Sequence, residues 1–247
     1  MPEQYIFIDE SGGPQFFAKK NRPLWLEEGF SPIMLIGMIK TENKKILRDQ
    51  VLAFQNSVLN DPLLNTIYSV AQPGWFLHAK SDHSDIILKT IEFLREIDSF
   101  ECHVVIGRKI PELFIHKHNS NANEFYFDLL SKLLELDDLT PENNYHLYLS
   151  QRQSNTDQRF SDAFKKALVA KSKKVGGFRY ACSVVRSKDS PEMSVIDYLL
   201  WTLQRYILKG EKRYFEAVKH HFSSMLDIYD QDEIGNGKLY NRSNPFD

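Results

Sequence analysis

The chain begins with an apolar segment that ends abruptly in two acidic residues. Residues 5–8, Tyr-Ile-Phe-Ile, have the composition of a buried strand, and Asp9 and Glu10 follow them before a Ser-Gly-Gly turn. Burying adjacent carboxylates costs free energy unless cations share them. The pattern therefore predicts ligands for Mg²⁺ or Mn²⁺, which prefer hard oxygen donors. The alternative is that both residues only cap a turn.

A second acidic residue, Asp197, lies in a helix predicted near the other end of the chain. Residues 190–192, Ser-Pro-Glu, are typical of a helix start. Asp197 falls at the margin of an apolar stripe with helical spacing, formed by Ile196, Leu199, Leu200, Leu203 and Ile207. From there it can reach a strand-end carboxylate such as Asp9, and two carboxylates around one or two metal ions suit phosphodiester hydrolysis. The alternative is an exposed Asp with no function.

The order of the predicted elements favours an α/β fold. Strands are expected at about 5–8, 31–39, 100–108, 145–150 and 178–186, and the first two are expected to pair as an antiparallel hairpin. Helices are expected at about 41–61, from Ser84, and at about 122–137, 157–172, 191–209 and 212–226. A hairpin followed by alternating strands and helices predicts a mixed sheet flanked by helices, with a helical C-terminal extension from about residue 211.

Composition favours a single globular domain spanning residues 1–247. The chain is 42% hydrophobic, and we find no repeat, low-complexity tract or linker. No apolar run approaches the roughly 18 to 20 residues of a membrane span, and the first residues lack signal-peptide features. We therefore expect a cytoplasmic protein with no membrane partner. Cys102 and Cys182 lie in apolar stretches, as buried thiols do.

One segment is strongly basic, although the net charge of −2 gives no overall positive field. Between residues 159 and 188 a single acidic residue, Asp162, accompanies nine basic ones: Arg159, Lys165, Lys166, Lys171, Lys173, Lys174, Arg179, Arg186 and Lys188. This segment precedes the Asp197 helix, so we expect Lys171, Lys173 and Lys174 to contact nucleic-acid phosphates near the site. The alternative is a solvated helix flank.

Other chemistries find little support. His116 and His118, like His220 and His221, lack the Cys partners or the spacing of a zinc site. No Gly-x-Ser-x-Gly, Gly-x-Gly-x-x-Gly or Walker motif occurs in the sequence. These absences exclude the motif-based assignments of a serine hydrolase or a nucleotide-binding enzyme.

Three segments together give the chain a family resemblance. They are residues 5–12 (Tyr-Ile-Phe-Ile-Asp-Glu-Ser-Gly), 76–82 (Phe-Leu-His-Ala-Lys-Ser-Asp) and 197–205 (Asp-Tyr-Leu-Leu-Trp-Thr-Leu-Gln-Arg). In these segments and their order, the chain resembles the DUF3800 family of ribonuclease H-like proteins. The resemblance implies a ribonuclease H-like fold, in which the first strand and the last helix each carry a metal-binding Asp.

Carried onto this sequence, the resemblance implies roles for six residues. Asp9 and Asp197 correspond to the metal pair, Glu10 to a supporting carboxylate and His78 to the histidine of the family, while Lys80 and Asp82 fit its His-Ala-Lys-x-Asp segment. Two positions depart from the pattern, because Phe76 and Ser150 stand where many relatives carry acids. Asp82, Asp157 or Asp189 can substitute for the missing carboxylates.

The first hypothesis is a Mg²⁺- or Mn²⁺-dependent nuclease acting on RNA or DNA. Asp9 and Asp197 would hold the ions, Glu10 or Asp82 would complete the shell, and His78 would position water or move a proton. Lys80 and Arg152 would steady the scissile phosphate. The second hypothesis is a non-catalytic module of the same fold that binds nucleic acid or a partner protein. A scaffold without a site is the third, and the sequence leaves the oligomeric state open.

Overall fold

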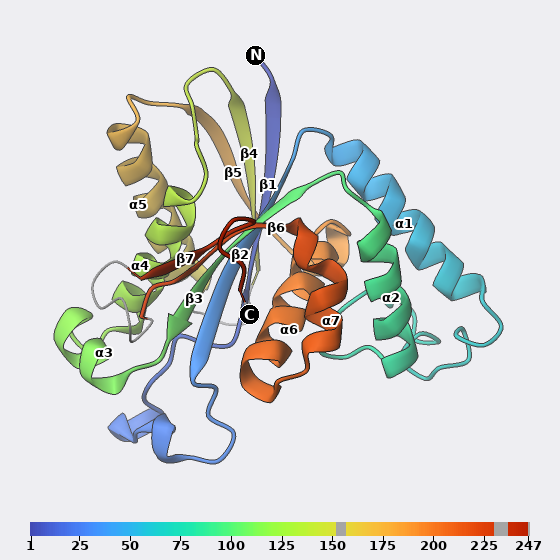
Figure 1. Ribbon diagram of the computed structural model, residues 1–247, viewed down its shortest axis with the longest axis horizontal. Helices are drawn as coiled ribbons and strands as arrows, with labels where there is room; N and C mark the ends of the chain where they lie inside the picture. The colour runs from blue at the N-terminus through green and yellow to red at the C-terminus, as the bar shows by residue number, and fades with distance from the viewer. Residues whose placement is uncertain (152–156, 230–236, 247) are drawn as a thin grey trace.

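A seven-stranded mixed β-sheet forms the centre of the molecule (Figure 1). We describe a computed structural model, which places residues 1–151, 157–229 and 237–246. The strand order is β5-β4-β1-β2-β3-β6-β7. The strands are β1 (Glu3–Ser11), β2 (Ile33–Thr41), β3 (Glu101–Arg108), β4 (Asn144–Ser150), β5 (Arg179–Val185), β6 (Phe222–Asp227) and β7 (Lys238–Tyr240). β1, β2 and β3 form an antiparallel meander, whereas β4 lies parallel to β1, β5 to β4 and β6 to β3.

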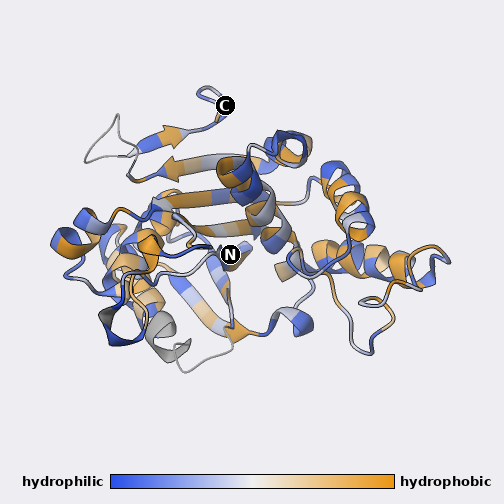
Figure 2. Ribbon diagram, turned by 90° about the horizontal axis from the view of Figure 1, so that it is seen from below, coloured by the Kyte–Doolittle hydropathy of each residue, from blue (hydrophilic) through white to orange (hydrophobic). Residues whose placement is uncertain are grey.

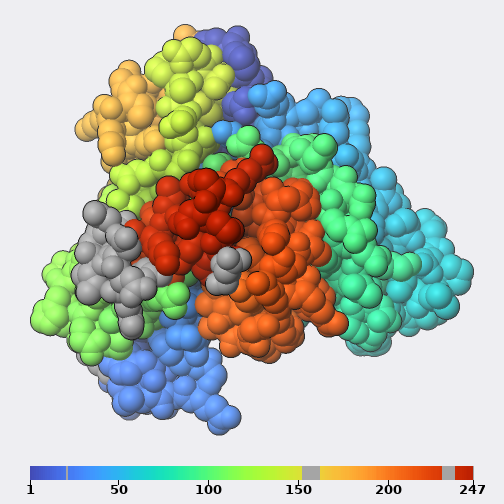
Figure 3. Space-filling model, in the orientation of Figure 1, coloured from blue at the N-terminus to red at the C-terminus, as the bar shows by residue number. Residues whose placement is uncertain are grey.

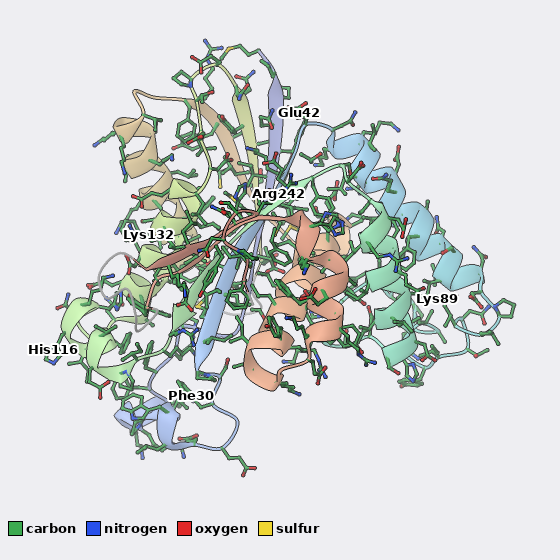
Figure 4. All side chains as sticks on the ribbon, viewed as in Figure 1. Phe30, Glu42, Lys89, His116, Lys132 and Arg242 are labelled. Atoms are coloured by element: carbon green, nitrogen blue, oxygen red, sulfur yellow. The ribbon has the colours of Figure 1, made fainter. Side chains whose placement is uncertain are left out.

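Helices cover both faces of this sheet, as Figure 1 shows. One face carries α1 (Lys44–Asn60), α2 (Ser84–Glu96), α6 (Met193–Lys209) and α7 (Lys212–Val218). The other carries α4 (Ala122–Glu135) and α5 (Asp157–Lys174), with α3 (Pro111–Lys117) beside them. Lys89 of α2 and Lys132 of α4, labelled in Figure 4, mark the two opposite layers. This is the α/β arrangement, a mixed sheet flanked by helices, that the sequence predicts.

Alternation along β1 separates two hydrophobic cores. Phe7 packs into the core under α1, α2 and α6, whereas Ile6 and Ile8 pack into the core under α4 and α5. Successive side chains of a strand point to opposite faces, so a strand buried on both sides is apolar throughout. Figure 2 shows this as strands that are mostly hydrophobic between helices of mixed hydropathy. The apolar start of the chain is therefore a strand near the middle of the sheet.

The C-terminal region differs from the prediction of a helical extension. The helix α7 ends at Val218, and the later residues of the helix expected at about 212–226 lie in β6 (Phe222–Asp227) instead. Phe215, Val218, Phe222 and Met225 have helical spacing, but Phe222 and Met225 are also buried within a strand that pairs with β3. A short apolar segment fits both helical spacing and strand alternation. Here the segment pairs with the edge of β3 and is therefore a strand. In Figure 3 the last residues, in red, lie against α6 and α7.

The missing side chain at Gly37 lets α6 lie directly on the β1–β2 hairpin. Gly37 pairs with Asp9 in the antiparallel register. A Cβ atom at this position would lie 2.7 Å from Cδ2 of Leu200 and 2.9 Å from Cδ1 of Ile196. Both distances are shorter than ordinary van der Waals contacts. The close approach brings Asp197, the neighbour of Ile196, over the end of β1.

We expect Gly37→Val to lower the free energy of unfolding by about 1–3 kcal/mol, because extra methyl groups would overpack this interface. Urea denaturation measures the effect. Gly107→Val is a parallel variant on the opposite face of the sheet, where a Cβ atom would lie 2.6 Å from Cδ2 of Leu129. It should lower the free energy of unfolding by a similar amount. A Gly37→Val protein as stable as the wild type would contradict the close packing of α6.

Candidate metal centre

A cavity of about 990 Å³ opens where β1 and β4 end and α6 begins. Its acidic lining residues are Asp9, Glu10 and Asp197, which come from opposite ends of the chain. Its basic lining residues are His78, Lys80, Arg186, Lys188, Arg205 and Lys209. The carboxylates thus share a cavity with an excess of cationic side chains, an arrangement suited to a metal ion and a polyanion together.

Asp9 and Asp197 reach the cavity from two elements that pack on each other. Asp9 follows the buried residue Ile8 near the end of β1, and Asp197 lies in the second turn of α6. The hydroxyl of Ser11 donates a hydrogen bond of 2.9 Å to Oε1 of Gln204, which ties the end of β1 to α6. The two carboxylates that the sequence pairs therefore line one cavity. Their sharing of an ion stays a prediction.

Asp197 is held by the segment that follows Leu77. The backbone N–H of Ala79 donates a 2.7 Å hydrogen bond to Oδ2 of Asp197, and Nδ1 of His78 lies 3.7 Å from the same oxygen. Burial raises the pKa of Asp197 to about 7, the Ala79 hydrogen bond opposes the shift, and the charge of Asp82 adds to it. A cation beside this carboxylate would offset the cost of its ionisation. The protein therefore presents an oxygen ligand that a metal ion would stabilise.

Asp82 takes a different role from the one predicted. Its side chain is buried and does not line the cavity. Its carboxylate accepts hydrogen bonds from Nε1 of Trp75 at 3.0 Å, from the backbone N–H of His78 at 2.8 Å and from the hydroxyl of Tyr198 at 2.6 Å. Because Tyr198 follows Asp197 in α6, Asp82 fixes the His78–Ala79 segment against this helix. The structure therefore gives Asp82 a positioning role instead of a place among the ligands.

Glu10 lies at the cavity, but its carboxylate is held from the other side of the sheet. The hydroxyl of Tyr126, on α4, donates a 2.5 Å hydrogen bond to Oε2 of Glu10. Adjacent residues of a strand point to opposite faces, so Asp9 faces α6 while Glu10 faces α4. Among the residues that the structure places, no three His, Cys, Asp or Glu side chains surround one point as a metal cluster would. Water and a substrate phosphate would have to complete the shell around Asp9 and Asp197.

Phe76 and Ser150, where the sequence departs from the pattern of the family that it resembles, both line the cavity. Ser150 lies at the end of β4, and its hydroxyl is 3.3 Å from that of Ser187. Neither Phe76 nor Ser150 adds a carboxylate to those of Asp9, Glu10 and Asp197.

Lys171, Lys173 and Lys174 do not lie near the site, although the sequence predicted that they would. All three lie at the C-terminal end of α5, where Lys171 donates to the carbonyl of Asp137 and Lys174 pairs with Glu135. Asp137 also pairs with Lys40, whose partner in the sheet is Ile6, near the start of β1. These lysines therefore lie at the opposite end of the sheet from the cavity.

The end of the same basic segment does reach the cavity. α5 runs away from the site and β5 returns toward it, so Arg186 and Lys188, just after β5, line the cavity. Strand direction was the signal that could have separated them from the lysines of α5. Lys80 also lines the cavity, as expected, whereas Arg152 lies outside the described residues. Sequence reasoning missed Arg205 and Lys209, which face the cavity from α6.

Comparisons with known proteins give a structural likeness only. No family model and no curated protein matches the sequence. The chain is similar to the PCNA:RNase HII complex from Archaeoglobus fulgidus, with 11% identity over 86% of this chain and 78% of that chain and a TM-score of 0.45. It is also similar to ribonuclease H2 from Pyrococcus horikoshii OT3, with 13% identity over 85% and 76% of the two chains and a TM-score of 0.47. Within the described residues, no helix is long and apolar enough to cross a membrane. The resemblance to the DUF3800 family stays a prediction.

Proposed function

We propose that this protein is a DUF3800-type nuclease that hydrolyses phosphodiester bonds of RNA or DNA with Mg²⁺ or Mn²⁺. The observation that carries the proposal is the meeting of Asp9 from β1 and Asp197 from α6 in one cavity lined by cationic side chains. Carboxylate oxygens are the donors that these ions prefer. The residues present therefore fit a divalent ion, with Asp9 and Asp197 as its protein ligands.

A divalent ion held by Asp9 and Asp197 would supply a nucleophilic hydroxide and stabilise charge on the leaving oxygen. The side chains of this protein would do the rest. His78 lies beside Asp197 and lines the cavity, where its ring can take a proton from water or return one to the leaving group. Lys80 and Lys188 face the same space and would neutralise the phosphates on either side of the reacting bond. The hydrogen bonds that Asp82 accepts from the backbone of His78 and the hydroxyl of Tyr198 hold His78 in position beside α6.

Arg205 is a cation of the cavity that its neighbours hold in place. Its guanidinium makes two hydrogen bonds to Glu211, at 2.6 and 2.5 Å, and lies 4.8 Å from the ring centroid of Trp201. Because Glu211 takes Nε and one hydrogen of Nη2, the Nη1 hydrogens and the second Nη2 hydrogen remain as donors for phosphate oxygens. We therefore assign Arg205 to phosphate binding, beside Lys80.

We expect the purified protein to cleave labelled RNA or DNA with Mg²⁺ or Mn²⁺ and to lose this activity in EDTA. Single strands, duplexes and RNA–DNA hybrids, tested in parallel on gels, would identify the substrate. Asp9→Asn protein purified in the same way controls for contaminating nucleases. Cleavage that persists in EDTA would contradict a metal-dependent mechanism.

A non-catalytic module that binds nucleic acid is the second candidate. The presence of Phe76 and Ser150 in the cavity favours it, since acids at these positions would complete a two-ion site. This candidate predicts binding of nucleic acid without cleavage by any divalent ion. The same assay, combined with a binding measurement, therefore separates the two.

A further inference from the structure

A smaller cavity of about 320 Å³ adjoins the candidate metal centre. Gln151 and Arg186 line both cavities, so the two are neighbours along one wall. We call the smaller one the side groove. It is lined by Lys44 and Arg48 of α1, Tyr148 of β4, Val184 and Val185 of β5, and by Gln151, Arg186, Asp189 and Ser190. The element α1 thus borders a groove that begins at the ends of the parallel strands β4 and β5.

The cations of the side groove are held in place. Nζ of Lys44 lies 4.0 Å from the ring centroid of Tyr148, whose ring stacks on Phe7 at 4.9 Å. Nη1 of Arg48 pairs with the fully buried carboxylate of Glu192 at 3.2 Å. Ordered cations lose less conformational entropy when an anion binds than free lysines do.

The groove has one cation that no carboxylate neutralises. Its lining holds Lys44, Arg48 and Arg186 with a single acidic residue, Asp189. Nε of Arg186 donates to Oδ2 of Asp189 at 2.5 Å and Arg48 pairs with Glu192, so among the described residues Lys44 is the lining cation without a carboxylate partner. The groove therefore offers an uncompensated positive charge to an anion, and its shared wall continues into the cavity proposed to hold a scissile phosphate.

We propose that the side groove binds a phosphodiester group of the same nucleic-acid strand that occupies the candidate metal centre. The inference rests on the proposed function, because it takes its occupant from the neighbouring cavity. A polyanion that leaves the cavity past Arg186 would enter the groove directly and meet Lys44 and Arg48. The groove would lengthen the bound segment beyond the reacting nucleotides and hold the strand during cleavage.

Binding in EDTA tests this inference separately from catalysis, because no cleavage can occur. Fluorescence anisotropy would follow single-stranded RNA and DNA of about 4 and about 16 nucleotides at several salt concentrations. We expect Lys44→Gln to weaken binding of the long strand by about 3-fold or more and to flatten its log–log salt slope by about 0.7, the value for one phosphate of a single strand. Binding of the short strand should not change if it fills only the main cavity.

Two variants and one competitor complete the experiment. Lys44→Arg keeps the charge and should bind as the wild type does, and Lys45→Gln removes an exposed neighbouring lysine of the same helix and should leave the salt slope unchanged. Thermal melting confirms that all variants fold. The inference is overturned if Lys44→Gln and Lys45→Gln bind the long strand equally. It is also overturned if Lys44→Gln weakens competition by polyglutamate, a non-nucleic polyanion, and leaves binding of the oligonucleotide unchanged. If the protein binds the long strand in a Lys44-dependent way but does not cleave it with Mg²⁺ or Mn²⁺, only the nuclease proposal is contradicted.

Discussion

Asp9→Asn protein will lose metal-dependent cleavage, by at least about 10²-fold, while it stays folded. The amide removes a charged oxygen ligand from the proposed ion site, and a weakly held ion neither activates water nor stabilises the leaving oxygen. Without metal the same change relieves repulsion between carboxylates, so the melting temperature in EDTA should be equal to or above that of the wild type. Cleavage rates with Mn²⁺ and melting curves in EDTA measure the two effects.

Asp49→Asn is the matched control for this experiment, because Asp49 is an exposed carboxylate on α1 that pairs with Lys45. It should keep full activity. Unchanged cleavage by Asp9→Asn would remove Asp9 from the mechanism. A lower melting temperature in EDTA would instead support the role of Asp9 as a turn cap.

The second large effect is expected in a polar cluster between α3, α4 and the residues after β6. Oδ2 of Asp128 accepts hydrogen bonds from Nζ of Lys117 at 2.8 Å, from Nε2 of His118 at 3.2 Å and from the hydroxyl of Tyr229 at 3.0 Å. Burial works against the charge, but these hydrogen bonds and the Lys117 charge hold the pKa of Asp128 well below its usual value. We expect Asp128→Ala to lower the free energy of unfolding by about 2–4 kcal/mol at pH 7, because buried partners lose their acceptor.

This loss should depend on pH in one direction. A carboxyl whose pKa is lower in the folded state stabilises the fold fully above its unfolded pKa, about 3.9, and loses this contribution as the pH falls toward its folded pKa. Urea denaturation at pH 7 and pH 3 should therefore show a smaller difference between Asp128→Ala and wild type at the lower pH. Asp49→Ala should show little difference at either pH. A penalty for Asp128→Ala that is independent of pH would mean that packing, not the charged carboxylate, stabilises the cluster.

The sequence predicted those strands and helices whose burial shows in the spacing of apolar residues close together in the chain. The apolar run before Asp9 identified β1, and the stripe beside Asp197 identified the buried face of α6, so both residues were found in one cavity. The succession of the first two apolar runs also predicted that β2 pairs antiparallel with β1. These features depend on burial, which alternation and helical spacing report directly.

The rest depends on contacts between distant segments. The lysines of α5 were misplaced because a basic segment that contains a helix and a returning strand spans the full depth of the sheet. Asp82 carries a ligand-like motif, yet its hydrogen bonds to Trp75 and Tyr198 become visible only when the segment folds onto α6. The side groove likewise joins α1 to the ends of β4 and β5, which no sequence spacing connects.

At the proposed metal centre, Gly37 would make the spacing between α6 and the β1–β2 hairpin a determinant of metal geometry. This residue carries no functional group, yet its missing side chain lets Ile196, the neighbour of Asp197, lie close to the position that pairs with Asp9. Metal–oxygen bonds vary by only about 0.2 Å within a working site. A shift of a few tenths of an ångström, which a hydrophobic core absorbs at modest cost, is thus large on the scale of a coordination sphere. In the proposed site, position 37 would therefore act as a spacer, and its substitutions would change ion selectivity through distance with both carboxylates still present.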